Sequence, residues 1–299
     1  MLLYGKTLLI ILGPTASGKT DLAIKAAKWF GTEIISADSR QFYRELNIGT
    51  AKPSSEQLQE VKHHFIGHLS IREKYNISQF EHDVILLLDE LFLSHDTVVM
   101  TGGSGLYIDA VCHGLDDQPG HDPAIRHLLT EAYKAKGINY LRDELFRLDP
   151  VYYREVDLAN PHRLLRALEV CMMTGKPYTS YRTGRKKNRD FRVIKIGIDI
   201  PREELVKRIN LRVDDMITRG LAEEARANYS SRNLNALNTV GYKEMFDYLD
   251  GLCTLEDAIE KIKINTRRYA KRQLTWFRRD QEIKWITPNS TINFNSLTI

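Results

Sequence analysis

Apolar positions along the chain fall into two patterns, short unbroken runs and longer runs with a helical period. The unbroken runs at Leu8–Leu12, Glu33–Ser36 and Thr97–Thr101 predict buried strands. The segments Lys19–Phe30 and Ile77–Ser94 repeat their apolar residues every three or four positions and predict helices. Strands that alternate with helices in this order predict a parallel sheet with helices on its faces.

The pattern changes in the middle of the chain. Between residues 115 and 191 only helices are predicted, at Asp122–Lys136, Asn139–Arg147 and Pro161–Thr174. A predicted strand at Val193–Asp199 restores the alternation. The elements predicted after it include the helix Leu255–Arg279 and the strand Lys284–Thr287. We therefore expect an α/β core of residues 1–114 and 192–299, interrupted by a helical insertion domain at residues 115–191.

Composition narrows the class of protein. With 299 residues, 42% of them hydrophobic, the chain can bury the core of one large domain or of a domain with an insertion. Its cysteines Cys112, Cys171 and Cys253 are far apart and lack ligand-spaced histidines, which favours a reducing compartment over disulfides or structural zinc. The first strand begins close to Met1, and no apolar run approaches the ~20 residues that cross a bilayer. We expect a cytoplasmic monomer without membrane attachment.

A glycine-rich motif follows the first strand directly. It has the form G-x-x-x-x-G-K-[ST] and comprises Gly13, Pro14, Thr15, Ala16, Ser17, Gly18, Lys19 and Thr20. Between a buried strand and a helix start, it predicts a phosphate-binding loop whose backbone amides and helix N-terminus face an anion. Lys19 can reach terminal phosphate oxygens, and the Thr20 hydroxyl is the predicted ligand of Mg²⁺. With the parallel sheet, the motif predicts a P-loop NTPase-like fold, but it does not distinguish a nucleotide from another phosphorylated ligand.

Acidic residues near the predicted sheet have different interpretations. Ile85–Glu90 imitates the magnesium-binding strand of an ATPase, but its helical period favours a helix. The strand Val98–Thr101 ends in threonine and glycines, so it lacks the acid that an ordinary P-loop ATPase holds for Mg²⁺. Asp38 follows the second strand at the carboxyl edge of the sheet, where open α/β sheets bind ligands. From position alone, Asp38 is equally well a general base or a residue that caps a turn.

Basic residues gather in two stretches, although the formal net charge is only +4. The first comprises Arg182, Arg185, Lys186, Lys187, Arg189 and Arg192. The second comprises Arg267, Arg268, Lys271, Arg272, Arg278 and Arg279, interleaved with Tyr269, Trp276 and Phe277. Because cations neutralise phosphates and aromatic rings stack on bases, the second stretch favours nucleic-acid binding over a merely solvated helix face.

Together, these motifs resemble those of the bacterial tRNA dimethylallyltransferase family, whose members prenylate the adenosine next to the anticodon. The matching segments run in the family's order over almost the whole chain. They are Gly13–Thr20, Asp38–Tyr43, Ile48–Pro53, Gly102–Tyr107, Pro161–Val170, Val240–Lys243 and Lys271–Arg278. Each segment after the first is a weak signal alone, but the ordered set is highly specific.

The resemblance implies a role for individual residues, with Mg²⁺ as cofactor and the tRNA anticodon stem-loop as partner. The phosphate loop would hold dimethylallyl diphosphate in place of ATP, Asp38 would be the general base, and Arg212 would contact the diphosphate. The implied catalytic residues are Asp38, Lys19, Thr20 and Arg212. Contacts to tRNA are implied for Asp38, Ser39, Arg40, Gln41, Ser104, Arg126, His162, Arg163, Leu164, Leu165, Arg166, Asn238, Thr239, Val240, Gly241, Tyr242, Lys243, Lys271, Arg272, Gln273, Leu274, Thr275, Trp276, Phe277 and Arg278.

Two positions depart from the family's pattern. Ser104 stands where the family usually has threonine, and it keeps the hydroxyl. Lys243 stands where arginine is frequent, and a lysine cannot make the bidentate interaction of a guanidinium.

Other functions share some of these features. A related isopentenyltransferase acting on free AMP or ADP would have the same loop, but the basic helix and the helical insertion favour a macromolecular acceptor. A P-loop small-molecule kinase also combines the loop with helical lids, and it would transfer the γ-phosphate of ATP. A non-catalytic RNA-binding protein would leave the phosphate loop unexplained.

Overall fold

The computed structural model describes residues 5–288, 290 and 292–294, and the chain divides into two compact units. The core unit contains the residues up to Cys112 and those from Arg189 onward, and the helical unit contains residues 113–188. The insertion expected at residues 115–191 falls on the helical unit to within a few residues at either end. Residues 1–4, 289, 291 and 295–299, which belong to the expected core, lie outside the described residues.

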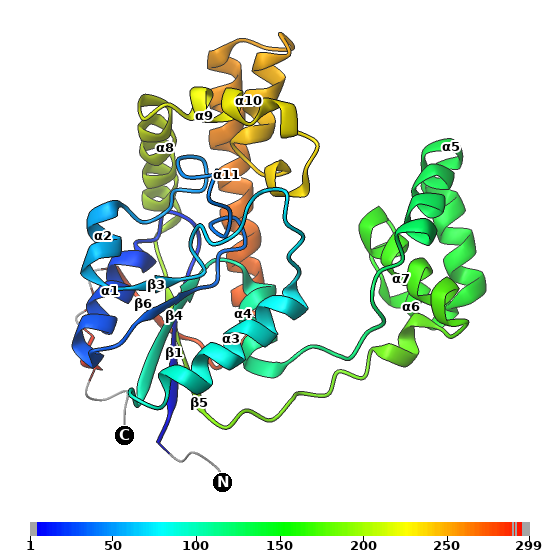
Figure 1. Ribbon diagram of the computed structural model, residues 1–299. Coiled ribbons are helices and arrows are strands. Elements are labelled where there is room, and N and C mark those ends of the chain that lie inside the picture. Colours follow the sequence, from blue (N-terminus) through cyan, green and yellow to red (C-terminus); the bar gives the residue numbers. More distant parts are fainter. Residues whose placement is uncertain (1–4, 289, 291, 295–299) are drawn as a thin grey trace. The chain divides into compact units, whose positions relative to one another are not determined.

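A six-stranded parallel sheet lies at the centre of the core unit, with the strand order β3-β2-β4-β1-β5-β6 (Figure 1). Its strands are β1 Thr7–Leu12, β2 Ile34–Ser36, β3 His63–His64, β4 Thr97–Gly102, β5 Arg192–Ile198 and β6 Lys284–Ile286. Every residue of β1 and β4 is buried, which explains their unbroken apolar runs. The predicted strands are confirmed. β3 was not predicted because its two residues carry no recognisable apolar pattern.

Helices cover both faces of this sheet. On one face, α1 Lys19–Phe30 packs its alanines against Leu9 and Ile11 of β1. On the other face, α3 Ile77–Leu91 packs against Leu8 and the residues that alternate with it. The helical interpretation of Ile85–Glu90 is confirmed, because these residues lie within α3.

The remaining core helices stand together at the top of Figure 1 or flank the sheet. They are α2 Ser55–Glu60, α4 Gly105–His113, α8 Arg202–Thr218, α9 Leu221–Ala227, α10 Tyr242–Leu249 and α11 Leu255–Phe277. Helix α11 packs against α8 and α10 through a buried cluster that includes Val213, Tyr242 and Ile262. Its other end reaches the sheet, where Phe277 joins the core. One helix thus connects the helical end of the core unit to the sheet.

The helical unit has a hydrophobic core of its own, which includes Leu129, Leu141 and Leu168. Its elements are α5 Pro123–Leu148, α6 Pro150–Glu155, α7 Pro161–Thr174 and a short 3₁₀ helix, Tyr178–Tyr181. Gly137 interrupts α5 with φ 76° and ψ −173°, where the sequence predicts a gap between two helices. No helix in the described parts of either unit is long and apolar enough to span a bilayer.

Candidate active site

The phosphate loop Gly13–Thr20 joins β1 to α1 at the carboxyl end of the sheet. Ala16 and Gly18 have positive φ angles of 63° and 84°, so the backbone curls tightly here. The Lys19 ammonium turns back toward the loop and donates to the Pro14 carbonyl at 3.3 Å. The start of α1 and its lysine therefore face the same short turn.

Two cavities meet beside this loop. The larger, of 1190 Å³, is lined by residues of the core unit alone, including the turn after β2. The smaller, of 220 Å³, is lined by the phosphate loop, the start of α1, residues of the segment 51–57 and Arg212. The residues that line both are Lys19, Thr20, Ala51, Pro53 and Arg212. A ligand with its phosphates in the smaller cavity would therefore present its other end to the larger one.

Two cations and one acid interact where the cavities meet. Burial lowers the pKa of Lys19 to about 8, an effect that the Asp38 carboxylate partly opposes and the Arg212 guanidinium reinforces. Burial also lowers the pKa of Arg212, again against the attraction of Asp38. The three groups carry one more positive than negative charge, so an anion is a favourable ligand for them.

Asp38 forms part of a tight turn and also lines the larger cavity. Its Oδ1 accepts a hydrogen bond from the Arg40 amide at 3.0 Å, and its carbonyl accepts one from the Gln41 amide at 3.1 Å. Oδ2 has no hydrogen-bond partner among the residues that the structure describes. One oxygen therefore caps the turn, and the other is available to a ligand.

Ser104 and Tyr269 support this turn from two other elements. Ser104 comes just after β4, and its hydroxyl accepts a hydrogen bond from the Ser39 amide at 3.1 Å. Tyr269 of α11 forms a hydrogen bond with the same serine, and burial together with the Asp38 carboxylate raises the pKa of Tyr269 to about 12. Tyr269 is thus a neutral hydroxyl beside the acid at neutral pH. In the sequence this residue stands out only as an aromatic in a basic stretch.

Arg40 and Gln41 connect the Asp38 turn to neighbouring loops. Gln41 Nε2 donates to the Thr50 carbonyl at 3.2 Å, and Arg40 Nη1 donates to the Asn235 carbonyl at 2.8 Å. Both side chains line the larger cavity. They therefore hold its walls in place as well as facing its interior.

The predicted segment Asn238–Lys243 lines the larger cavity with one exception. The lining members are Asn238, Thr239, Val240, Gly241 and Lys243. Tyr242 is fully buried, and its hydroxyl donates to Glu224 at 2.5 Å. The same carboxylate accepts from the Ile48 amide at 2.9 Å. Tyr242 therefore supports the loop that contains Ile48.

The motif on α11 contains a buried glutamine that bridges two loops. Gln273 Oε1 accepts from the Thr15 amide of the phosphate loop at 2.9 Å, and its Nε2 donates to the Gly103 carbonyl at 2.9 Å. A Cβ atom at Gly103 would lie 2.2 Å from that nitrogen, so only glycine allows this approach. Trp276 likewise donates to Asp109 of α4 at 2.9 Å.

The other members of this motif divide between core and surface. Arg272 lines the larger cavity, whereas Leu274 and Phe277 pack into the hydrophobic core. Arg272 is also exposed, as are Lys271, Thr275 and Arg278. Of the whole motif, Arg272 and Gln273 are the members that reach the cavity.

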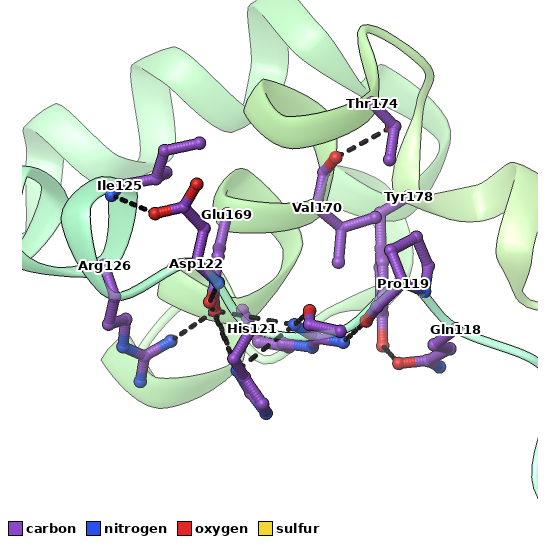
Figure 2. Close-up of polar contacts among 12 residues, drawn as sticks. Gln118, Pro119, His121, Asp122, Ile125, Arg126, Glu169, Val170, Thr174 and Tyr178 are labelled. Atoms are coloured by element: carbon purple, nitrogen blue, oxygen red, sulfur yellow. Dashed lines mark hydrogen bonds and ion pairs between the residues drawn. The ribbon is translucent and has the colours of Figure 1, made fainter.

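The helical unit contains the remaining predicted RNA contacts. Leu164 and Leu165 are buried in its core and stabilise the unit itself. Arg126 and Arg166 both reach the buried carboxylate of Glu169, and Figure 2 shows the contact of Arg126. The exposed members are His162 and Arg163.

The parallel sheet, the phosphate loop after its central strand and the adjoining cavities define a P-loop α/β protein. The family model described as IPP transferase matches residues 41–280. The chain belongs to the IPP transferase family. It is 53% identical to tRNA dimethylallyltransferase 1 of Bacteroides fragilis, over 95% of this chain and 94% of that protein. It is 56% identical to tRNA dimethylallyltransferase of Christiangramia forsetii, over 93% and 92% of the two chains.

Solved structures show the same fold. The crystal structure of the full-length tRNA isopentenylpyrophosphate transferase from Bacillus halodurans matches with a TM-score of 0.69 and 37% identity, over 98% of this chain and 93% of that one. A eukaryotic dimethylallyltransferase acting on tRNA matches with a TM-score of 0.79 over 95% of this chain and 74% of that one. At 24% identity, this second match concerns the fold alone.

Proposed function

We propose that this protein transfers the dimethylallyl group of dimethylallyl diphosphate to the exocyclic amine of the tRNA adenosine 3′-adjacent to the anticodon, releasing diphosphate. The observation that carries the proposal is the junction of the two cavities. Lys19, Thr20 and Arg212 line both, and Asp38 lines the larger beside them. A diphosphate and a base amine can therefore meet at one point. The family and the names of the relatives support the same reaction.

The cations at the junction suit a departing diphosphate. Negative charge builds up on this group as its C–O bond to the allylic carbon breaks. Groups that already face that position stabilise the transition state without reorganising. Lys19, Arg212 and the phosphate loop line the smaller cavity, as does the cation Lys52.

Asp38 is the proposed general base. The adenine amine is a weak nucleophile because its lone pair is delocalised into the ring, so removal of its proton during attack lowers the barrier. Asp38 Oδ2 is available for that proton, since Oδ1 is hydrogen-bonded to the Arg40 amide. Tyr269, as a neutral hydroxyl hydrogen-bonded to Ser104, keeps the surrounding turn in place.

The size of the larger cavity favours a macromolecular acceptor. Its 1190 Å³ exceeds the range of about 300–1,000 Å³ that is usual for small-ligand pockets. A base flipped out of a single-stranded loop could enter it, and the anticodon loop makes this cheaper than a duplex would. The RNA would also cover the opening and exclude water from the reacting allylic carbon.

Mg²⁺ is the proposed cofactor. The described residues contain no cluster of three or more histidine, cysteine or acidic side chains that could hold a metal alone. The Thr20 hydroxyl, which lines both cavities, fits an ion that takes its other ligands from diphosphate and water. The ion would supply further positive charge to the leaving group.

Contacts to tRNA are proposed for the residues named from the sequence that remain accessible. In the core unit these are the cavity-lining members of the Asp38 turn, the 238–243 segment and Arg272, together with the exposed Lys271, Thr275 and Arg278. In the helical unit they are His162, Arg163 and Arg126. Buried members such as Tyr242 would act by holding their neighbours. We also propose a monomer that works in the cytoplasm, where tRNA is found.

The test is to incubate the protein with dimethylallyl diphosphate and Mg²⁺, using tRNA or AMP as acceptor. Mass analysis of anticodon-loop nucleosides should find a prenylated adenosine in the tRNA reaction. A tRNA with guanosine at the target position is the control and should stay unmodified. Prenylation of AMP with unmodified tRNA would contradict the proposal, as would phosphoryl transfer from ATP.

A further inference from the structure

A buried acid of the helical unit, Glu169 of α7, gathers donors from several segments of the chain (Figure 2). Its side chain has no exposed surface. Oε2 lies 3.3 Å from Arg126 Nη1 and 3.5 Å from Arg166 Nη1. Oε1 accepts from the Asp122 amide at 3.1 Å and lies 3.1 Å from His121 Nδ1. A buried carboxylate is retained only where it is well paired, and Glu169 meets that condition.

The contacts of Glu169 fix Arg126 in two ways. One is direct, through the guanidinium. The other is through the backbone, because Asp122 is the N-cap of α5 and accepts from the amides of Ala124 and Ile125. Glu169 therefore holds both the first turn of the helix that carries Arg126 and the end of its side chain.

The two arginines that contact Glu169 differ in how many N–H donors they leave available to a ligand. Arg166 also donates to the carbonyls of Pro119 at 2.5 Å and Gly120 at 2.9 Å, and its side chain is 20% exposed. Arg126 donates to Glu169 through Nη1, and its side chain is 34% exposed. A guanidinium has five N–H donors, so Arg126 keeps donors for a ligand, whereas Arg166 mainly secures the 119–121 segment.

We propose that Glu169 is a positioning residue for tRNA binding, which holds Arg126 in one orientation for an RNA phosphate. The inference rests on the function proposed above. A flexible arginine loses side-chain freedom when it binds a phosphate, whereas an arginine already ordered by the fold does not. Glu169 thus improves tRNA affinity although it touches no RNA, and although its own charge repels phosphate.

The test is Glu169→Gln, which keeps the size of the side chain and removes its charge. Because a hydrogen bond to a charged group is lost, KM for tRNA should rise about tenfold. KM for dimethylallyl diphosphate and kcat should stay at wild-type values, since the catalytic junction lies in the core unit. Glu131→Gln is the matched control, because it removes an exposed charge from α5 whose ion pair is with Lys134, and it should change none of the three.

A double-variant cycle separates positioning from other effects. Arg126→Gln should raise KM for tRNA by a similar factor, and adding Glu169→Gln should raise it little further. If Glu169 only compensated charge, its loss would strengthen the attraction to RNA and lower KM for tRNA. An unchanged KM, a lower KM or fully additive variants would overturn the proposal.

Folding is checked by the melting temperature of each variant. If Glu169→Gln does not fold, Glu169→Asp is the second variant, because it keeps the buried charge but draws the carboxylate away from Arg126, and the same rise in KM for tRNA is expected. Failure of the proposed function itself would look different, since the wild-type protein would then transfer no prenyl group to tRNA.

Discussion

Three side chains determine what the junction of the cavities can bind. Lys19 and Arg212 bring positive charge, and Asp38 interacts with both while keeping one oxygen available. The open oxygen of Asp38 is placed to accept a proton, and the two cations keep an excess charge for an anion. Proton removal and binding of the leaving group thus depend on these three residues.

Replacement of Asp38 should separate chemistry from binding. Asp38→Asn keeps an oxygen for the Arg40 amide, so the turn should persist, but an amide cannot take the proton. We expect turnover to fall by about 10²–10⁴-fold, with the Kd for tRNA largely retained. Single-turnover rates and filter binding measure the two quantities. Asp89→Asn, an exposed position on α3, is the control, and near-normal turnover of Asp38→Asn would exclude Asp38 as the base.

Diphosphate binding should weaken with rising pH. The pKa of Lys19 is lowered to about 8, so the ammonium is lost as the pH passes 8 and not near the value of 10.5 usual for lysine. KM for dimethylallyl diphosphate should therefore be constant below about pH 8 and rise above it, by at most about tenfold per pH unit. The same measurement on Lys19→Met should give a higher KM without this rise.

Lys52 is the necessary comparison for this pH dependence. Burial lowers its pKa to about 8 as well, and it lines the smaller cavity. If Lys52→Met, and not Lys19→Met, abolished the rise in KM, the titrating group would be Lys52.

At the scale of elements, α11 organises the site. Its Gln273 joins the phosphate loop to the loop after β4, and its Trp276 holds α4. Its Tyr269 supports the Asp38 turn through Ser104. The basic stretch that predicted RNA binding is therefore also the helix that assembles three loops of the core unit.

Loss of the two hydrogen bonds of Gln273 should weaken ligand binding at the phosphate loop. Gln273→Ala removes both hydrogen bonds and leaves the Thr15 amide and Gly103 carbonyl without these partners. We expect the free energy of unfolding to fall by about 1–3 kcal/mol and KM for dimethylallyl diphosphate to rise. Urea denaturation and initial rates are the measurements. Gln281→Ala, at an exposed position beyond the helix, is the control, and a Gln273→Ala protein with wild-type stability and KM would contradict the bridge.

At the scale of the whole molecule, the chain forms two units with separate hydrophobic cores. The segments that enter and leave the helical unit are paired, because the Lys187 amide donates to the His113 carbonyl at 2.7 Å. A short linker could therefore close the chain after removal of the unit. The cavities would be retained, because they are lined by the core unit alone.

This division predicts that diphosphate binding and RNA binding can be separated. Replacing residues 114–187 by a short glycine–serine linker should leave a folded core that binds dimethylallyl diphosphate with unchanged affinity by calorimetry. KM for tRNA should rise at least about tenfold. The logarithmic salt dependence of tRNA binding should become shallower by about 0.7 for each RNA phosphate that the helical unit neutralises in the intact protein. Unchanged KM for tRNA in the shortened protein would show that the helical unit does not contact RNA.

The sequence by itself determined the elements and the phosphate loop. Buried strands, amphipathic helices and the turn around Gly18 depend on neighbours along the chain, so their residues identify them directly. The break of α5 at Gly137 was predictable for the same reason. β3 was not, because its two residues carry no apolar pattern and pair with β2, which is distant along the chain.

Only the tertiary structure decided which motif residues face the cavity and which support it. Tyr242, Leu164 and Gln273 belong to motifs that imply RNA contact, yet each is buried. Tyr269 and Glu169 are not among the implied RNA contacts, yet they hold residues that are. The physical reason is that a side chain's surroundings come from elements distant in sequence, and local pattern carries no information about those partners.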